Sequence, residues 1–218
     1  MESLTLVQQL AVWALPVLLA VTLHEAAHGY VARALGDSTA AQLGRLSLNP
    51  LRHIDPVGTL LVPGLLLAMG GFLFGWAKPV PVNPARLKQG RRSMAWVAVA
   101  GPLANLAMAI GWAILLKLLL VSGAEGGIAT GLRYMALAGM AINILLMVLN
   151  LLPLPPLDGS RVLGGFLPPQ QAQMLDRIEP YGLIILLALL FTGVLGFILW
   201  PLYGAVDGVV RGMTGLAS

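Results

Sequence analysis

Long apolar stretches alternate with short polar connections along the chain. Four of these stretches reach the length of about 20 mainly apolar residues that a helix needs to cross a bilayer. They predict helices over residues 4–35, 94–122, 134–152 and 181–206. Gly36-Asp37 should end the first helix, and Pro201 should kink or end the last one.

A fifth apolar stretch, residues 57–76, is long enough to span but is interrupted by Pro63 and by Gly70-Gly71. It fits either a crossing helix or a re-entrant hairpin that turns near the glycines. The polar connection 36–56 and the segment 77–82 (AKPVPV) are punctuated by Pro and Gly and look strand-like. We therefore expect short β-strand insertions there.

Composition supports a membrane protein. Hydrophobic residues make up 58% of the 218 residues, only 10% are charged, and the mean hydropathy is +0.85. A soluble domain carries about 25% charged residues, so this chain cannot cover a water-facing surface. The predicted fold is an α-helical multi-pass membrane protein: a bundle of about four to six transmembrane or re-entrant helices, with residues 1–218 as a single membrane-embedded domain. The N-terminus lacks the basic region of a cleavable signal peptide.

Basic residues indicate the orientation. The connection 77–93 contains five of them and no acid, so it should be cytoplasmic. The two helices that follow then return the chain, with Asp158, to the cytoplasmic side. If residues 57–76 crossed once, Asp158 would emerge opposite the end of the first helix, so we expect re-entry. The net charge of +4 includes no long basic run, which fits loops against anionic lipid and argues against nucleic-acid binding.

The first helix contains the sequence HEAAH. His24 and His28 are four residues apart and lie on one face of a helix, while Glu25 follows the first of them. This is the arrangement of zincins, in which two histidines bind zinc and the glutamate is the general base. The alternative is a helix end that matches the motif by chance. A charged residue at the centre of a membrane helix costs about 2.5–3.5 kcal/mol, so ionisable groups buried there need a compensating partner and the metal site is favoured.

A catalytic zinc needs a third protein ligand, and the chain has no cysteine. Asp158 is the leading carboxylate because it lies within the proline-rich run NLLPLPPLDG, a stiff backbone that at membrane depth must line a cavity or be buried. The alternative is an ordinary loop aspartate before glycine. His53 is the third and last histidine. It is either an interfacial residue or a lid or extra ligand of the metal.

HEAAH, AGPLAN (residues 100–105) and NLLPLPPLDG (residues 150–159) together resemble the site-2 protease family of intramembrane metalloproteases. The resemblance implies His24, His28 and Asp158 as ligands of one Zn²⁺ per chain and Glu25 as the base that activates a zinc-bound water. It implies that Asn150 binds the substrate backbone or the oxyanion, although a helix–helix hydrogen bond is the alternative for this residue. The PDZ-like and CBS-like modules of many members are not found.

The resemblance also implies a substrate class, namely single-pass membrane proteins cut in or near their transmembrane segments. The run LSLNPLRHIDPVGT resembles small bacterial and archaeal members, so we expect a prokaryotic cell membrane and an active site nearer the cytoplasm. The strand-like Val80–Val82 could hold an unwound substrate by edge pairing. Two other functions are considered: a metal transporter, which should show several ligand clusters or repeats, and an inactive membrane scaffold.

Overall fold

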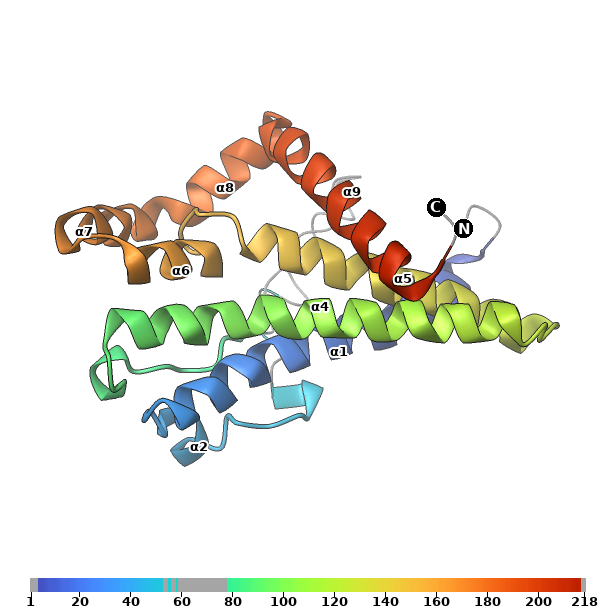
Figure 1. The fold of residues 1–218 in the computed structure, drawn as a ribbon, viewed down its shortest axis with the longest axis horizontal. Helices are drawn as coiled ribbons and strands as arrows, with labels where there is room; N and C mark the ends of the chain where they lie inside the picture. Colours follow the sequence, from blue (N-terminus) through green and yellow to red (C-terminus); the bar gives the residue numbers. More distant parts are fainter. Residues whose placement is uncertain (1–3, 53–54, 56–57, 59–77, 217–218) are drawn as a thin grey trace.

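The computed structural model describes residues 4–52, 55, 58 and 78–216. Three long helices form the centre of the molecule: α1 (Leu6–Ala34), α4 (Arg91–Val121) and α5 (Gly127–Asn150). Helices α4 and α5 run antiparallel along the long axis, and α1 packs against both (Figure 1). The α-helical bundle expected from the sequence is confirmed for the described part of the chain.

Shorter elements complete the fold. Helix α2 (Thr39–Gln42) and the 3-10 turns η1 (Pro50–Arg52) and η3 (Pro84–Arg86) follow α1. After α5 come α6 (Asp158–Phe166), α7 (Pro169–Ile178), η4 (Glu179–Tyr181), α8 (Gly182–Phe191) and α9 (Val194–Thr214). Helices α6 and α7 lie at the end of the bundle where α4 begins, and α9 returns across α4 and α5 (Figure 1).

Four described helices are long and apolar enough to cross a membrane. They are Val7–Ala34, Arg91–Val121, Gly127–Asn150 and Val194–Thr214. Their outer faces carry exposed apolar side chains such as Leu10, Leu118 and Phe197. Such surfaces suit lipid and not water. The chain is therefore a membrane protein.

Small residues let the helices of the core approach closely. Ala109 and Ala113 of α4 and Met140 and Ile144 of α5 are buried in one apolar cluster. A Cβ on Gly139 would lie 2.4 Å from the Trp112 ring, so glycine is required where these two helices meet. In a bilayer this close packing, and not the hydrophobic effect, holds helices together.

The predicted β-strands are wrong for the residues that the structure describes, where no strand occurs. Instead of a strand, residues 39–42 form α2, and just before it the Asp37 carboxylate accepts a hydrogen bond from the Thr39 N–H, as in an Asx turn. Residues 78–82 are extended but unpaired. Pro79 and Pro81 have no N–H to donate to a neighbouring strand, and the Val80 N–H donates to the Glu25 carboxylate instead.

The last apolar stretch also differs from the expected single helix over 181–206. It is divided into α8 and α9 at Gly193, whose φ of +77° ends α8 in a left-handed conformation. Pro201 lies inside α9, which continues to Thr214. Most of the stretch 57–76 is outside the described residues, so re-entry remains a prediction.

Candidate metal centre

The HEAAH sequence lies on the inner face of α1, against α4. His24 and His28 are both buried, and their Nε2 atoms are 3.0 Å apart. Their rings meet edge to face, with an interplanar angle of 87°. The i, i+4 spacing therefore produces the convergent pair that the sequence predicted. His28 precedes the end of α1 by six residues, or about 9 Å along the helix axis, so the pair lies in the third of the bundle nearest α2 and α6.

Asp158 reaches the same place from a distant part of the sequence. It is the first residue of α6, and its Oδ2 lies 3.2 Å from His24 Nε2 and 3.3 Å from His28 Nε2. Glycine is required at position 159, because a Cβ there would lie 2.2 Å from the Leu151 carbonyl oxygen. The chain can thus fold back tightly on the end of α5 and bring Asp158 to α1.

The outer nitrogen of each imidazole faces an oxygen. His28 Nδ1 donates to the Val97 carbonyl at 2.7 Å, and His24 Nδ1 donates to Asn105 Oδ1 at 2.5 Å. A carbonyl oxygen only accepts, so each neutral ring carries its proton on Nδ1 and presents an unprotonated Nε2 to the centre. These second contacts are the ones that orient metal-binding histidines.

Three acceptor atoms therefore converge on one point. Asp158 Oδ2 is buried and has no hydrogen-bond partner among the described residues. In its ionised form, the form that binds metals, a carboxylate only accepts hydrogen bonds. One proton could join only a single pair of these three atoms, whereas a metal cation satisfies all of them.

The separations of the three atoms fit tetrahedral zinc. Zinc binds histidine nitrogen and carboxylate oxygen at about 2.0–2.2 Å, which places neighbouring ligand atoms roughly 3.3–3.5 Å apart. The observed separations of 3.0, 3.2 and 3.3 Å come within about 0.3 Å of that range. Two histidines and one carboxylate also leave a fourth position open, as in hydrolytic zinc sites.

Gly101 of α4 leaves the space that this centre needs. A Cβ at this position would lie 2.5 Å from His28 Nε2 and 2.6 Å from both Cε1 and Nε2 of His24. Any side chain larger than hydrogen would therefore intrude on the convergent nitrogens.

Glu25 lies at the edge of the same group. One carboxylate oxygen and the ligand nitrogens of His24 and His28 all lie within 4.8 Å of one another. Glu25 Oε2 accepts a hydrogen bond from the Val80 N–H at 2.8 Å. The carboxylate is thus held by a backbone amide while it faces the centre.

The extended segment 78–83 is fixed at both ends. The Arg45 guanidinium donates to the carbonyls of Lys78 and Pro79, and the Asn83 N–H donates to Asp37 Oδ2 at 2.6 Å. Burial raises the pKa of the Asp37 carboxyl, but its hydrogen bonds from Thr39 and Asn83 outweigh this and lower the pKa overall. Asp37 is therefore an ionised anchor for the segment that contacts Glu25.

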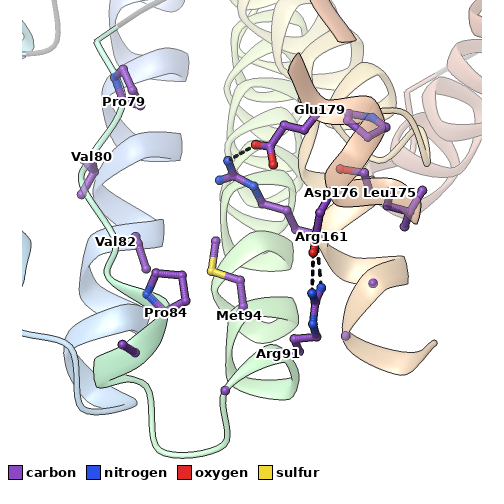
Figure 2. A pocket seen from close by; sticks show the side chains of 16 residues that line it. Pro79, Val80, Val82, Pro84, Arg91, Met94, Arg161, Leu175, Asp176 and Glu179 are labelled. Atoms are coloured by element: carbon purple, nitrogen blue, oxygen red, sulfur yellow. Dashed lines mark hydrogen bonds and ion pairs between the residues drawn. The ribbon is translucent and has the colours of Figure 1, made fainter. Parts of the chain in front are cut away.

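Two neighbouring cavities lead to the centre. The inner cavity, of about 520 Å³, is lined by His24, Glu25, His28, Asn150 and Asp158, among others. The outer cavity, of about 670 Å³, lies between the segment 79–84 on one side and α6 and α7 on the other, with Met94 and Arg91 between them (Figure 2). The residues that line both are Pro79, Val80, Val82, Met94 and Arg161. The cavities therefore adjoin.

The outer cavity is bordered by two exposed ion pairs. Arg91 binds Asp176 and Arg161 binds Glu179, as Figure 2 shows. The wall of the outer cavity is therefore more polar than the apolar outer faces of the helices. A polar wall is what a path for water to the centre requires.

The structure thus brings together five of the six residues selected from the sequence. Asn150 lines the inner cavity, and its Nδ2 donates to the Leu146 carbonyl of its own helix at 3.0 Å. His53 lies outside the described residues, so its role remains a prediction.

Sequence reasoning missed Gly101, Asn105 and the Val80 amide. A signal for the first two was present, because AGPLAN places Gly101 and Asn105 four residues apart on one helix face. Nothing in the sequence could identify the Val80 N–H, because its contact with Glu25 spans 55 positions.

Comparisons with known proteins agree with this chemistry. The chain is 41% identical over 186 residues to the protein named "Putative zinc metalloprotease YwhC" of Bacillus subtilis, covering 84% of this chain and 82% of that protein. It is 33% identical to proteins named "Putative zinc metalloprotease Rip2" of Mycolicibacterium smegmatis and Mycobacterium tuberculosis, covering about 80% of this chain and 64% and 63% of theirs. No family profile and no solved structure matches the chain.

Proposed function

This chain belongs to the site-2 protease family of zinc metalloproteases, and from that membership we propose that it hydrolyses peptide bonds in or near the transmembrane segments of membrane proteins. The observation that carries the proposal is the convergence of His24 Nε2, His28 Nε2 and the partnerless Asp158 Oδ2 within 3.3 Å of one another. In the proposal these three atoms hold one Zn²⁺ per chain.

A zinc ion held by His24, His28 and Asp158 would lower the pKa of water to about 7 and would polarise the scissile carbonyl. Glu25 is the general base: it takes the proton from the attacking water and delivers it to the leaving amine. The Val80 N–H, which donates to Glu25 Oε2, keeps the carboxylate at the edge of the centre and leaves its other oxygen for this proton transfer.

Asn150 is assigned to the substrate. Its side chain borders the cavity that contains the centre, so its amide can donate to a substrate carbonyl or to the oxyanion that develops there. In the structure the Asn150 amide donates to the Leu146 carbonyl of its own helix, and this bond orients the side chain. A bound substrate would replace this hydrogen bond or share the amide with it.

The proposed substrates are single-pass membrane proteins, and the proposed location is the cell membrane of a prokaryote. Arg86, Lys88, Arg91 and Arg92 lie at or just before the start of α4, the end of the bundle where α6 and α7 also lie, and an excess of such residues marks the cytoplasmic side. Water then enters from the cytoplasm through the outer cavity. A substrate helix must unwind to be cut, and the extended segment 78–83 beside Glu25 is the proposed support for it.

The test compares wild type with Glu25→Gln, which keeps the three ligands and removes the base. Each is co-expressed with a panel of single-pass membrane proteins, and new protein termini in the membrane fraction are mapped by mass spectrometry. We expect termini within or next to transmembrane segments only with wild type. Equal termini in both samples would overturn the proposal. Zinc uptake into proteoliposomes, equal in both variants, would instead support a transporter.

A further inference from the structure

Two buried amides extend from the metal centre into the middle of α5. Asn105 of α4 and Asn143 of α5 are both fully buried, with no exposed surface. Asn105 Nδ2 donates to Asn143 Oδ1 at 2.9 Å, and Asn143 Nδ2 donates to the Gly139 carbonyl at 2.8 Å. We propose that Asn143, which does not itself contact the centre, is a positioning residue that fixes the protonation pattern of His24 through Asn105.

The Gly139 carbonyl determines the direction of each hydrogen bond in the series that runs through Asn143 and Asn105 to His24. The Gly139 carbonyl only accepts, so the NH₂ group of Asn143 must face it, and the Asn143 oxygen must face Asn105. The NH₂ group of Asn105 then faces Asn143, and its oxygen faces His24. His24 must donate from Nδ1, which leaves Nε2 unprotonated toward the centre. Asn143 and Gly139 thus determine which nitrogen of His24 is free to bind a metal.

A second acceptor supports Asn105 less well. Asn105 Nδ2 also lies 3.3 Å from the Ala20 carbonyl, at the long end of the hydrogen-bond range. Without Asn143 this contact alone would oppose rotation of the amide. In the rotated state the NH₂ group faces His24, which would then accept at Nδ1 and carry its proton on Nε2, directed at His28 and Asp158. That tautomer has no lone pair to offer a metal.

His28 provides an internal comparison. Its Nδ1 donates to the backbone carbonyl of Val97, which no side-chain rotation can reverse. The structure therefore predicts that the tautomer of His28 is independent of Asn143, while that of His24 depends on it.

A purely structural role for the Asn105–Asn143 bond is the competing explanation. It would join α4 to α5, but these helices already pack through the apolar cluster that includes Ala109, Ala113 and Met140. Losing a structural bond would lower the melting temperature without changing the affinity for zinc. The experiment must therefore separate affinity from stability.

The test uses two variants of purified full-length protein in detergent. Asn143→Leu removes the acceptor for Asn105, while Asn143→Asp in its acid form keeps an oxygen facing Asn105 and an O–H that can donate to the Gly139 carbonyl. Zinc dissociation constants are measured by competition with a chelator. Loss of an outer contact to a metal ligand typically costs 10–100-fold in affinity. We expect about that loss in Asn143→Leu and recovery to within a few-fold of wild type in Asn143→Asp.

Histidine tautomers are read in parallel by NMR of protein with ¹⁵N-labelled histidine, since only three histidines need assignment. We expect Asn143→Leu to change the His24 signals and leave those of His28 unchanged. Met140→Ala, a cavity-forming change in the same helix, is the control that lowers the melting temperature without altering either readout. If Asn143→Leu does not fold, Asn143→Ala takes its place.

Wild-type zinc affinity and an unchanged His24 tautomer in Asn143→Leu would overturn the inference. An equal loss in Asn143→Leu and Asn143→Asp would also overturn it, because the acceptor would then be irrelevant. The inference rests on the proposed zinc function, but the two fail differently. If folded wild type binds no zinc, the proposed function fails, while the tautomer of His24 in the metal-free variants still tests the role of Asn143.

Discussion

Replacing Gly101 with alanine should damage the metal centre through a single added methyl group. The new Cβ would lie 2.5–2.6 Å from the Nε2 atoms of His28 and His24. Ordinary contact begins at about 3.5 Å, so helix α4 or the two rings must retreat by about 1 Å. Metal–ligand distances tolerate only about 0.2 Å. We therefore expect zinc affinity to fall at least about 100-fold, beyond the usual effect of changing an outer contact.

The assay is a zinc titration of metal-free Gly101→Ala against a competing chelator, together with its melting temperature. Gly111→Ala is the matched control, because it makes the same change in the same helix where nothing lies within 4 Å of the added Cβ. The control should bind zinc like wild type and be up to about 1 kcal/mol more stable. If Gly101→Ala bound zinc as tightly as Gly111→Ala, the proposed position of the metal would be wrong.

Three further predictions concern the surroundings of the centre. In Gly29→Ala the added Cβ would lie 2.8 Å from Leu46 Cδ1 and 3.0 Å from Val80 Cγ1. The contact with Val80 should push residues 78–83 away from Glu25 and reduce kcat several-fold with zinc content unchanged; unchanged kcat would refute this. The lowered pKa of Asp37 means that its ionised form stabilises the fold above about pH 4, its ordinary carboxyl value, and that this contribution is lost as the pH falls toward the lowered value. The melting-temperature difference between wild type and Asp37→Asn should therefore shrink between pH 6 and pH 3, and a constant difference would contradict the assignment. Arg91→Ala removes an exposed ion pair and should change the free energy of unfolding by less than about 1 kcal/mol in denaturant titrations; a larger loss would mean that the pair is a structural link between α4 and α7.

The convergence of His24, His28 and Asp158 was largely predictable because its signals are local. The i, i+4 spacing of His24 and His28 specifies a shared helix face, and Asp158 was singled out because its carboxylate comes at the end of a proline-rich run. The long apolar helices were predictable for the same reason, since length and hydropathy decide whether a segment can cross a membrane.

The remaining features depend on contacts between distant residues. The extended segment 78–82 resembled a strand, but whether it pairs depends on the Val80 N–H, which binds Glu25. The division of the last apolar stretch at Gly193 depends on one left-handed residue, and glycine is compatible with either a continuous or a broken helix. Asn105 and Asn143 could have been ordinary helix–helix contacts, and only their partners connect them to His24.

Metal content tests the central claim most directly. Wild type, His24→Ala, Asp158→Asn and Glu25→Gln are purified in detergent, and zinc is measured per folded chain by atomic emission. We expect about one zinc in wild type and in Glu25→Gln, and a large loss in His24→Ala and Asp158→Asn. Full zinc in Asp158→Asn would exclude Asp158 as a required ligand, and well-folded wild type that binds no zinc even when it is supplied would contradict the metal centre itself.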